Sequence, residues 1–544
     1  MKNAFSKKLA GGLLACAAVV SVFAFGGSTA YAEEATSLDI TITNSNGKDG
    51  STLRDGKYST ELSYAAGDTI TVSSDTDIAG LYIMWGSKVQ EWSFTTDTNA
   101  TAVTGGQNGF LHEYVSLDTV AKQCVITLGA NMDVCEIRAY SAGDLPSDVQ
   151  TWQTPYDRAD FLVLAAHADD EILFLGGVLA QYGGEQGLRV QVGYLTQYWE
   201  GPYANQIREH EKLDGLWASG ITHYPVCMNF EDNYSEDLAT AQSQVNYDDV
   251  LAVTREMINQ YQPQIVVTHD DKGEYGHGQH MLLSKAVTDT VSNPQAGDWD
   301  VPKTYLHLWG ENKITLDLRQ PLTNFGGQTA IEVASAAYLK HESQQYCWFY
   351  VSDDYEYSCA DFGLYRTTVG ADTGNDMMEN IVSYDEQDAA AAAEAELTQA
   401  AELTQAAELT EAAKTETGSN VASSGNSKNS NSKDTKSGSG IKTVVKVVVV
   451  ILLLAIILFL GLYIRKVKIE RERKRRRLAK MKRKLREEQL AQEKAMYEAR
   501  RKRQARMQSQ ARGGRSNEYA RYGRNYGSSS NRSRSSSYDR NERR

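Results

Sequence analysis

The 544-residue sequence predicts a β-sandwich domain, then an α/β domain with a parallel sheet, and a single transmembrane helix near the C-terminus. Three patterns support this prediction. Residues 36–145 contain short runs of alternating polar and apolar residues, separated by Gly, Asn and Asp. Residues 150–385 alternate unbroken apolar strands with helical segments, and residues 444–464 are almost entirely apolar. Such sharp changes in composition imply several parts with different surroundings.

The N-terminus has the pattern of a secretory signal peptide. Three lysines within the first eight residues precede an apolar run, and Ala30-Tyr31-Ala32 provides an Ala-x-Ala cleavage site. We therefore predict that residues 1–32 are removed after export. A retained N-terminal anchor and a lipoprotein-type cleavage before Cys16 are the alternatives.

Residues 36–145 are predicted to form a β-sandwich or jelly roll. Residues 38–42 and 69–72 alternate apolar and polar side chains, as strands with one buried face do. Repeated short strands of this kind with intervening turn residues are typical of sandwiches.

Part of this domain resembles the discoidin-like, galactose-binding modules that accompany extracellular carbohydrate enzymes. The resemblance rests on residues 81–92 and on the closing strand 134–140. It implies a possible carbohydrate-binding module. Trp85, Trp92 and Tyr114 could present aromatic faces to a sugar, but large aromatic side chains more often provide packing area in a core.

Residues 150–385 are predicted to form a Rossmann-like α/β domain. The expected elements are strand 161–165, helix 171–182, strand 190–195, helices 203–219 and 247–261, and strand 264–268. Unbroken apolar strands that alternate with helices indicate a parallel sheet with helices on both faces.

The rest of the chain is predicted to lead to and through a membrane. Residues 386–440 are of low complexity, with Ala-Glu-Leu-Thr-Gln-Ala repeats, and predict a spacer. Residues 444–464 are long enough to span a bilayer as one helix. The tail, 465–544, holds 29 Lys and Arg against 9 Asp and Glu, although the whole chain has a net charge of −14. The positive-inside rule places this tail in the cytoplasm, near an anionic inner leaflet.

This topology predicts a single-pass protein of a cell membrane, with the α/β domain on the outside of a bacterial cell. Clustered Lys and Arg can also neutralise nucleic-acid phosphates. The position of the basic tail directly after the apolar span favours lipid contact over nucleic acid.

Five cysteines remain after Cys16 is removed with the signal peptide. Cys124 with Cys135, and Cys347 with Cys359, are close enough in sequence to form disulfides in an oxidising compartment. Buried free thiols are an equally good interpretation.

Two polar loops directly follow strands of the α/β domain. The first covers residues 165–171, and the second covers residues 269–280. Because ligand sites in open α/β sheets lie at the carboxyl ends of the strands, the two loops can meet at one edge of the sheet. Two loops that meet there can build a metal site.

Each loop carries side chains that are suitable ligands for a catalytic zinc ion. Such a site commonly has three His, Asp or Glu ligands and one open position for water, whose pKa falls to about 7. His167 and Asp170 are three residues apart across a strand-to-helix turn, so both can face one ion while Asp169 lies beside it. His277 and His280 have the same spacing, which on a helical turn puts both rings on one face.

The segments 167–171, His-Ala-Asp-Asp-Glu, and 277–280, His-Gly-Gln-His, resemble the paired motifs of the LmbE-like, or PIG-L, zinc-dependent N-acetylglucosaminyl deacetylases. The resemblance covers about 159–350. Arg208 with Glu211 resembles the arginine-bearing helix of that family, and residues 343–344 resemble its later Ser-Gln pair. The family usually has proline where this chain has alanine at position 168, so the loop loses a fixed φ angle but no ligand.

The resemblance implies roles for six side chains. The expected ligands of Zn²⁺ are His167, Asp170 and His280. Asp169 would be the general base that takes a proton from water, His277 would support the oxyanion, and Arg208 would contact the substrate.

The predicted function is an extracytoplasmic, membrane-anchored hydrolase that removes acetyl groups from N-acetylated sugars, in glycans or conjugates of the N-acetylglucosaminyl type. The expected partners are the glycan and the membrane. The alternative is a glycan-binding adhesin or sensor with a non-catalytic deacetylase-like domain. The remaining histidines, His269 included, are expected to have packing or solvent-facing roles.

Overall fold

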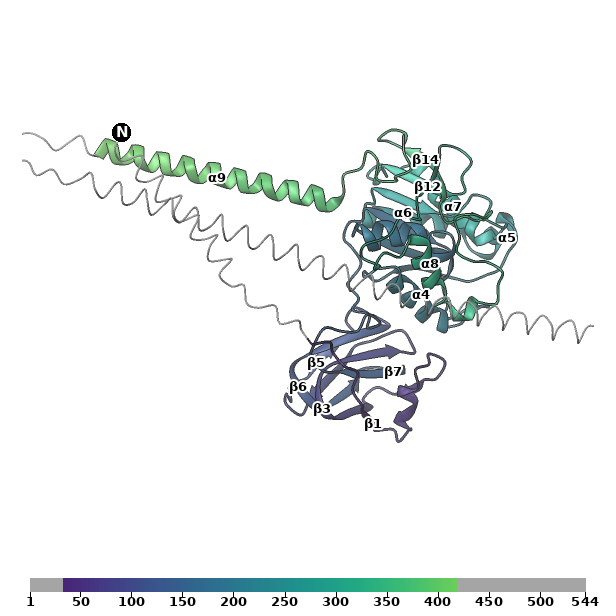
Figure 1. Ribbon diagram of the computed structural model, residues 1–544, viewed down its shortest axis with the longest axis vertical. Helices are drawn as coiled ribbons and strands as arrows, with labels where there is room; N and C mark the ends of the chain where they lie inside the picture. Colours follow the sequence, from purple (N-terminus) through teal and green to yellow (C-terminus); the bar gives the residue numbers. More distant parts are fainter. Residues whose placement is uncertain (1–32, 418–544) are drawn as a thin grey trace, which may run out of the picture. The chain divides into compact units, whose positions relative to one another are not determined.

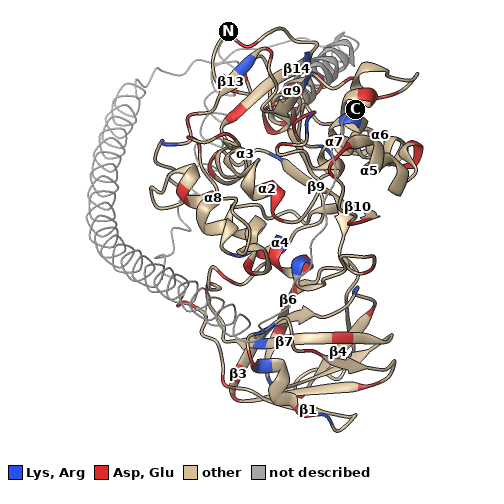
Figure 2. Ribbon diagram, turned by 90° about the vertical axis from the view of Figure 1, so that its right-hand side faces the viewer, with Lys and Arg blue, Asp and Glu red and all other residues tan. Residues whose placement is uncertain are grey.

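The computed structural model describes residues 33–417 (Figure 1). The predicted signal peptide 1–32, the apolar run 444–464 and the basic tail 465–544 lie outside these residues. Acidic side chains outnumber basic ones over the described ribbon (Figure 2).

The predicted single-pass membrane localisation is corrected. Between residues 33 and 417, no helix has the length and the apolar composition needed to cross a membrane. The longest helix, α9 (Tyr384–Thr417), carries Glu, Gln and Thr throughout its 34 residues.

The N-terminal domain is one seven-stranded antiparallel sheet and not the two sheets of a sandwich. Its strands are β1 (Thr41–Asn44), β2 (Leu62–Tyr64), β3 (Thr69–Trp85), β4 (Trp92–Thr96), β5 (Val103–Gly105), β6 (His112–Leu128) and β7 (Met132–Tyr140). Their order is β2-β7-β3-β6-β4-β5, with β1 beside β3. β3 and β6 have 17 residues each, and their pairing shifts register between Ser73 and Gly80. Such irregularities let long strands bend, so that one sheet can curl around its own core.

Two of the three aromatic residues considered as sugar contacts have a packing role. Trp85 and Trp92 are 0% and 1% exposed, and both indole N–H groups donate to Glu113. Tyr114 is only partly buried. Sugar binding by this domain stays a prediction.

The α/β domain is built on a second seven-stranded sheet. Its strands are β8 (Phe161–Ala165), β9 (Val190–Gln197), β10 (Val226–Glu231), β11 (Ile265–Thr268), β12 (Lys303–His307), β13 (Lys313–Thr315) and β14 (Asp361–Thr367). The order is β10-β9-β8-β11-β12-β14-β13. The first five strands are parallel, which confirms the predicted parallel sheet. β14 runs antiparallel to both neighbours and was not predicted.

Helices cover both faces of this sheet. They are α2 (Asp170–Leu173), α3 (Gly176–Val178), α4 (Ile207–Ala218), α5 (Leu238–Gln244), α6 (Tyr247–Tyr261), α7 (Gly278–Ser292), α8 (Ala330–Tyr338) and the short turn η3 (Glu342–Gln344). Because side chains alternate across a strand, Phe161 and Val163 pack in the core that contains α2, α4 and α8. Leu162 and Leu164 pack in the core that contains α6 and α7.

The predicted helix 171–182 is broken into α2, α3 and a π-helical segment, η2 (Leu179–Glu185). Gly176 and Gly177 lie at the break and pack closely against neighbouring elements. A Cβ atom on Gly177 would lie 2.4 Å from a methyl group of Leu318. The path of this segment is therefore set by tertiary packing as well as by local helix propensity.

Hydrogen bonds join the N-terminal domain to the α/β domain. The Tyr58 hydroxyl donates to Asp214, 2.9 Å away, and the Leu111 N–H donates to the Tyr224 hydroxyl, 3.0 Å away. His112 and His210 are both buried, with ring nitrogens 2.8 Å apart. The two histidines thus have the packing role expected for them.

All five cysteines of the described chain, Cys124, Cys135, Cys227, Cys347 and Cys359, are free. The structure therefore favours free thiols over the two candidate disulfides. Burial raises the pKa of Cys124 and Cys135 to about 12, which makes both thiols poor nucleophiles.

One buried ion pair joins strand β12 of the second sheet to the segment that follows β14. Lys303 of β12 has a fully buried side chain and pairs with Asp372, which is 3% exposed and also accepts from the Tyr305 hydroxyl. Removing one partner of a buried pair leaves the other charge uncompensated.

We predict that Lys303→Met lowers the free energy of unfolding by about 3–5 kcal/mol, measured by chemical denaturation. The control is Lys313→Met on β13, where the lysine is exposed, and a change below about 0.5 kcal/mol is expected there. Equal effects of the two substitutions would contradict the prediction.

Candidate active site

The two loops predicted to meet do meet, at the carboxyl ends of β8 and β11. The strand order of the sheet reverses between these two neighbouring strands. A reversal of this kind leaves a crevice above the sheet, where α/β domains bind ligands. His167 follows β8, and His277 and His280 stand at the start of α7, which follows β11.

Three side-chain atoms converge in this crevice. Asp170 Oδ2 lies 2.9 Å from His167 Nδ1 and 3.0 Å from His280 Nε2, and the two ring nitrogens are 3.2 Å apart. All three residues are at least 95% buried. The backbone N–H of His167 also donates to Asp170 Oδ2, at 2.8 Å. The three expected zinc ligands are therefore brought together.

The charges of the three groups are strongly coupled. Burial alone would raise the pKa of Asp170, but the rings of His280 and His167 hold it well below its usual range. Burial alone would lower the pKa of His280, but the carboxylates of Asp170 and Glu274 raise it to about 10. A site that holds a carboxylate against two imidazoles suits a divalent cation, which takes the place of the ring protons.

Other combinations of donors lie in the same crevice. His167, His277 and His280 have ligand atoms within 4.8 Å of one another, and so do Asp170, His269 and His280. Every donor in these two sets, and in the set of His167, Asp170 and His280, is a His or an Asp. Both residue types fit zinc and similar divalent ions. The residues present therefore fit a metal site.

Behind this site lies a buried carboxylate, Glu274, that three imidazoles surround. Its oxygens are 2.5 Å from His280 Nδ1, 2.9 Å from His307 Nδ1 and 3.1 Å from His269 Nδ1. A carboxylate that accepts from Nδ1 of His280 fixes the ring tautomer and leaves Nε2 free to bind an ion. Glu274 has a φ of +55°, so the loop adopts an uncommon backbone conformation to place it.

His167 has a similar partner on its other side. Its Nε2 lies 2.9 Å from Gln279 Oε1, so the ring can donate there while Nδ1 faces Asp170. Gln279 is held in turn by the backbone of Asn233, whose N–H donates to Oε1 at 3.1 Å. Both expected histidine ligands are thus oriented from behind.

Asp169 lies beside the converging atoms and is held in a strained conformation. Its φ is +129°, which residues other than glycine rarely adopt. Its N–H donates to Glu171 Oε2 at 2.8 Å, and the other oxygen of Glu171 lies 2.9 Å from the buried ring of His341. Burial, opposed by Arg208 and assisted by Asp170, raises the pKa of Asp169 to about 7. A carboxyl group of this kind can both accept and return a proton near neutral pH.

His277 is the N-cap of α7, where Nδ1 accepts from the Gln279 N–H at 3.3 Å. Burial and the neighbouring rings of His167 and His280 lower the pKa of His277, so the ring is neutral. With Nδ1 accepting, the proton is on Nε2. His277 can therefore donate a hydrogen bond into the crevice.

Arg208 of α4 is engaged by the protein itself. Its Nη2 donates to Asp169 Oδ1 at 3.1 Å and to the Ala168 carbonyl at 2.5 Å, and its Nη1 lies 3.4 Å from Asp232 Oδ2. The guanidinium also lies 4.2 Å from the centre of the Tyr198 ring. These contacts position Asp169. Substrate contact by Arg208 stays a prediction.

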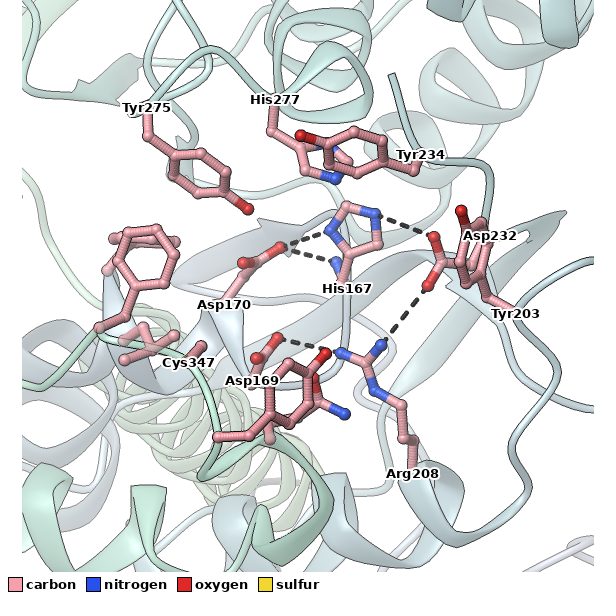
Figure 3. Close-up of a pocket in the computed structure, with 15 residues that line it drawn as sticks. His167, Asp169, Asp170, Tyr203, Arg208, Asp232, Tyr234, Tyr275, His277 and Cys347 are labelled. Atoms are coloured by element: carbon pink, nitrogen blue, oxygen red, sulfur yellow. Dashed lines mark hydrogen bonds and ion pairs between the residues drawn. The ribbon is translucent and has the colours of Figure 1, made fainter. Parts of the chain in front are cut away.

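A pocket of about 220 Å³ is lined by His167, Asp169, Asp170, Arg208 and His277, among others. Figure 3 shows His167 and Asp170 at its centre, Asp169 and Arg208 on one side, and Tyr275, His277 and Tyr234 on the opposite side. Asp232 lies between His167 and Arg208, with Oδ1 3.7 Å from His167 Nε2 and Oδ2 near the Arg208 guanidinium.

The chain contains a known family domain. Residues 162–291 match the family model described as PIG-L, GlcNAc-PI de-N-acetylase. Over these residues the chain is similar to the PIG-L deacetylases. The match runs from β8 to α7, and thus includes both loops of the site. The predicted resemblance is confirmed over residues 162–291.

The similar proteins cover only part of this chain. The 1D-myo-inositol 2-acetamido-2-deoxy-alpha-D-glucopyranoside deacetylase 2 of Saccharopolyspora erythraea is 29% identical over 175 residues, which cover 26% of this chain and 63% of that protein. The deacetylase of Streptomyces scabiei that acts on the same compound is 26% identical, over 33% of this chain and 67% of that protein. The solved N,N'-diacetylchitobiose deacetylase of Pyrococcus horikoshii is 16% identical, with a TM-score of 0.25, and covers 35% of this chain and 73% of that one. This chain thus spans less than two thirds of the first relative.

Several residues of the PIG-L site were not predicted from the sequence. No role was predicted for Glu274, and His269, His307 and His341 were expected only to pack or to face solvent. Each contacts a carboxylate beside the site. Asp232 was overlooked, although it directly follows β10 at the same edge of the sheet, and the rule that places ligand residues after parallel strands could have found it.

We predict that Glu274→Gln weakens zinc binding about 10- to 100-fold, because an amide orients the His280 ring less firmly than a carboxylate does. The measurement is competition with a chromophoric chelator. Glu311→Gln, at an exposed position, serves as the control. Unchanged affinity in Glu274→Gln would show that His280 does not bind the ion through Nε2.

Proposed function

We propose that this protein is a zinc-dependent deacetylase that hydrolyses the acetamido group of N-acetylated sugars, with Asp169 as the general base. The observation that carries the proposal is the convergence of His167, Asp170 and His280 beside a carboxyl group with a raised pKa, within the PIG-L domain. The named activities of the relatives, which act on an acetamido sugar, support the choice of substrate class.

His167, Asp170 and His280 would hold the metal. When bound, a divalent ion polarises a carbonyl group and lowers the pKa of water. The fourth neighbour, His277, accepts the Gln279 N–H at Nδ1, so its ring proton is on Nε2 and that nitrogen has no free lone pair for a metal. We therefore assign it to substrate and not to the metal.

Asp169 moves the proton in the proposed reaction. The oxygen of water attacks the acetyl carbonyl carbon while the Asp169 carboxylate takes a proton from that water. The carbon–nitrogen bond then breaks, and Asp169 returns the proton to the leaving nitrogen. The products are acetate and a free amine. A pKa of about 7 suits a group that must be both base and acid in one cycle.

His277 stabilises the charge that develops on the carbonyl oxygen. A neutral ring with its proton on Nε2 donates a hydrogen bond without bringing a charge of its own. The ring centre lies 4.6 Å from those of His167 and His280, so the donor is beside the reacting group. Arg208 keeps the Asp169 carboxylate aimed at the same point.

The proposal is tested by acetate release from N-acetylglucosamine oligomers by the full-length protein. We expect activity that disappears with a chelator and returns with zinc. Asp169→Asn should lower kcat by at least about 100-fold, because an amide cannot accept the proton. Asp248→Asn, an exposed carboxylate of α6, is the control. Absence of acetate release from every acetylated sugar, with zinc bound, would contradict the proposal.

The two possible roles of Arg208 can be separated by kinetics. If Arg208 acts through Asp169, Arg208→Lys should lower kcat about 10- to 100-fold through misplacement of the base, with little change in KM. An increase in KM at constant kcat would instead support the substrate contact predicted from the sequence.

A further inference from the structure

Aromatic side chains from four separate segments surround the mouth of the pocket. We name this group the aromatic rim, and it consists of Tyr203, Tyr234, Tyr275, Tyr346, Trp348 and Phe349. Tyr203, Tyr234 and Tyr275 come from the loops that follow β9, β10 and β11, and the other three follow η3. All except Trp348 line the pocket itself.

Five of the six rim residues are exposed, and Phe349 is half-buried. Tyr346 is 85% exposed, Trp348 59% and Tyr203 53%. In residues 33–417, Tyr350 is the one other exposed tyrosine or tryptophan, and it stacks on Tyr355. Exposed aromatic groups gathered in one place mark a binding surface.

The rim is continuous with the centre of the site. Ring centres are 4.2 Å apart for Trp348 and Phe349, 4.5 Å for Phe349 and Tyr275, and 5.8 Å for Tyr275 and His277. On the other flank, the Tyr234 ring centre is 5.3 Å from that of His277. Figure 3 shows Tyr203 and Tyr234 on the Asp232 side of the pocket, and Tyr275 and Cys347 on the opposite side. The rings thus extend away from the site in two directions.

The charges of the lining disfavour a substrate that carries an anionic group beside its acetamido group. Arg208 is the single Lys or Arg among the residues that line the pocket, and Asp169 and Asp232 already engage it. Together with Asp170, these carboxylates leave the lining acidic, or about neutral once a divalent ion is bound. A phosphate or carboxylate on the substrate would find no unpaired cation among these residues.

The composition of the rim favours a sugar over an acyl chain. Four of its six members are tyrosines, and Leu173 is the one aliphatic residue that lines the pocket. Tyrosine and tryptophan combine an apolar ring with a polar group that stays hydrated. A pyranose ring has the matching character, with an apolar face of C–H groups and an edge of hydroxyl groups.

We propose that the aromatic rim binds a neutral chain of N-acetylated sugars on both sides of the residue that is deacetylated. This inference rests on the proposed function and narrows its substrate to an oligosaccharide or a polymer. The sugars beside the reacting one stack on rim aromatics, and the pocket takes the acetamido group.

The test compares N-acetylglucosamine with its β-1,4-linked oligomers of two to five units, with full-length protein. We expect kcat/KM to rise with length by about fivefold for each ring that stacks. Trp348→Ala combined with Tyr346→Ala should reduce the ratio of pentamer to monomer kcat/KM at least about fivefold, mainly through KM. Trp348→Tyr, which keeps an aromatic ring, should retain much of the wild-type ratio of pentamer to monomer kcat/KM. Tyr350→Ala, a half-exposed tyrosine outside the rim, should leave the ratio unchanged.

Calorimetric binding of the same oligomers separates this inference from the proposed function. Length-dependent binding that is lost in the double variant, without acetate release, would uphold the rim and overturn the deacetylase. Acetate release with equal kcat/KM for monomer and pentamer would overturn the rim alone. Tighter binding of an alkyl N-acetylglucosaminide than of the tetramer would also overturn it, in favour of a lipid-like occupant. Neither release nor binding of any oligomer would overturn both proposals.

Discussion

The site depends on one buried carboxylate, that of Asp170. It is the first residue of α2, so the end of β8 fixes its position, and one of its oxygens lies within 3.0 Å of the rings of His167 and His280. A buried charge is tolerated only when it is paired. The loop after β8 and the start of α7 therefore have to meet for either of them to be stable in this place. Glu274 is a second buried carboxylate, and it lies on the other side of the His280 ring from Asp170. Both carboxylates favour the positive charge on that ring.

Local patterns in the sequence were sufficient for the parts of the fold that depend on local interactions. The strand 161–165 and the helix 247–261 have the predicted bounds. The curled N-terminal sheet could not be predicted in the same way, because its curvature depends on register shifts between β3 and β6. β13 has three residues, of which only Ile314 is buried. It is stabilised by pairing with β14, which lies almost fifty residues later, and a run of that length carries no signal of its own.

The same distinction explains which site residues were found. His167 with Asp170, and His277 with His280, stand three residues apart in loops that follow apolar strands, so this spacing and the position of ligand sites at strand ends predict that the two loops can share one edge of the sheet. His341 follows Glu171 by 170 residues and reaches it because α8 packs beside α2. No spacing rule connects such a pair. Its contribution is to support the strained backbone of Asp169, and only the folded packing shows that this backbone needs support.

The division of work in the pocket follows from its charges. Every ionic group in it is already paired within the protein: Arg208 with two carboxylates, and Asp170 with two imidazoles. If one of these groups bound the substrate instead, its buried partner would be left unpaired. The free energy lost in this way exceeds the free energy that an exposed contact with the substrate provides. We therefore expect the rest of the substrate to be recognised by side chains that take no part in these ion pairs. The exposed aromatic side chains beside the pocket meet that condition. In the proposed function, buried charged groups carry out the reaction, and uncharged aromatic rings at the surface select the rest of the substrate.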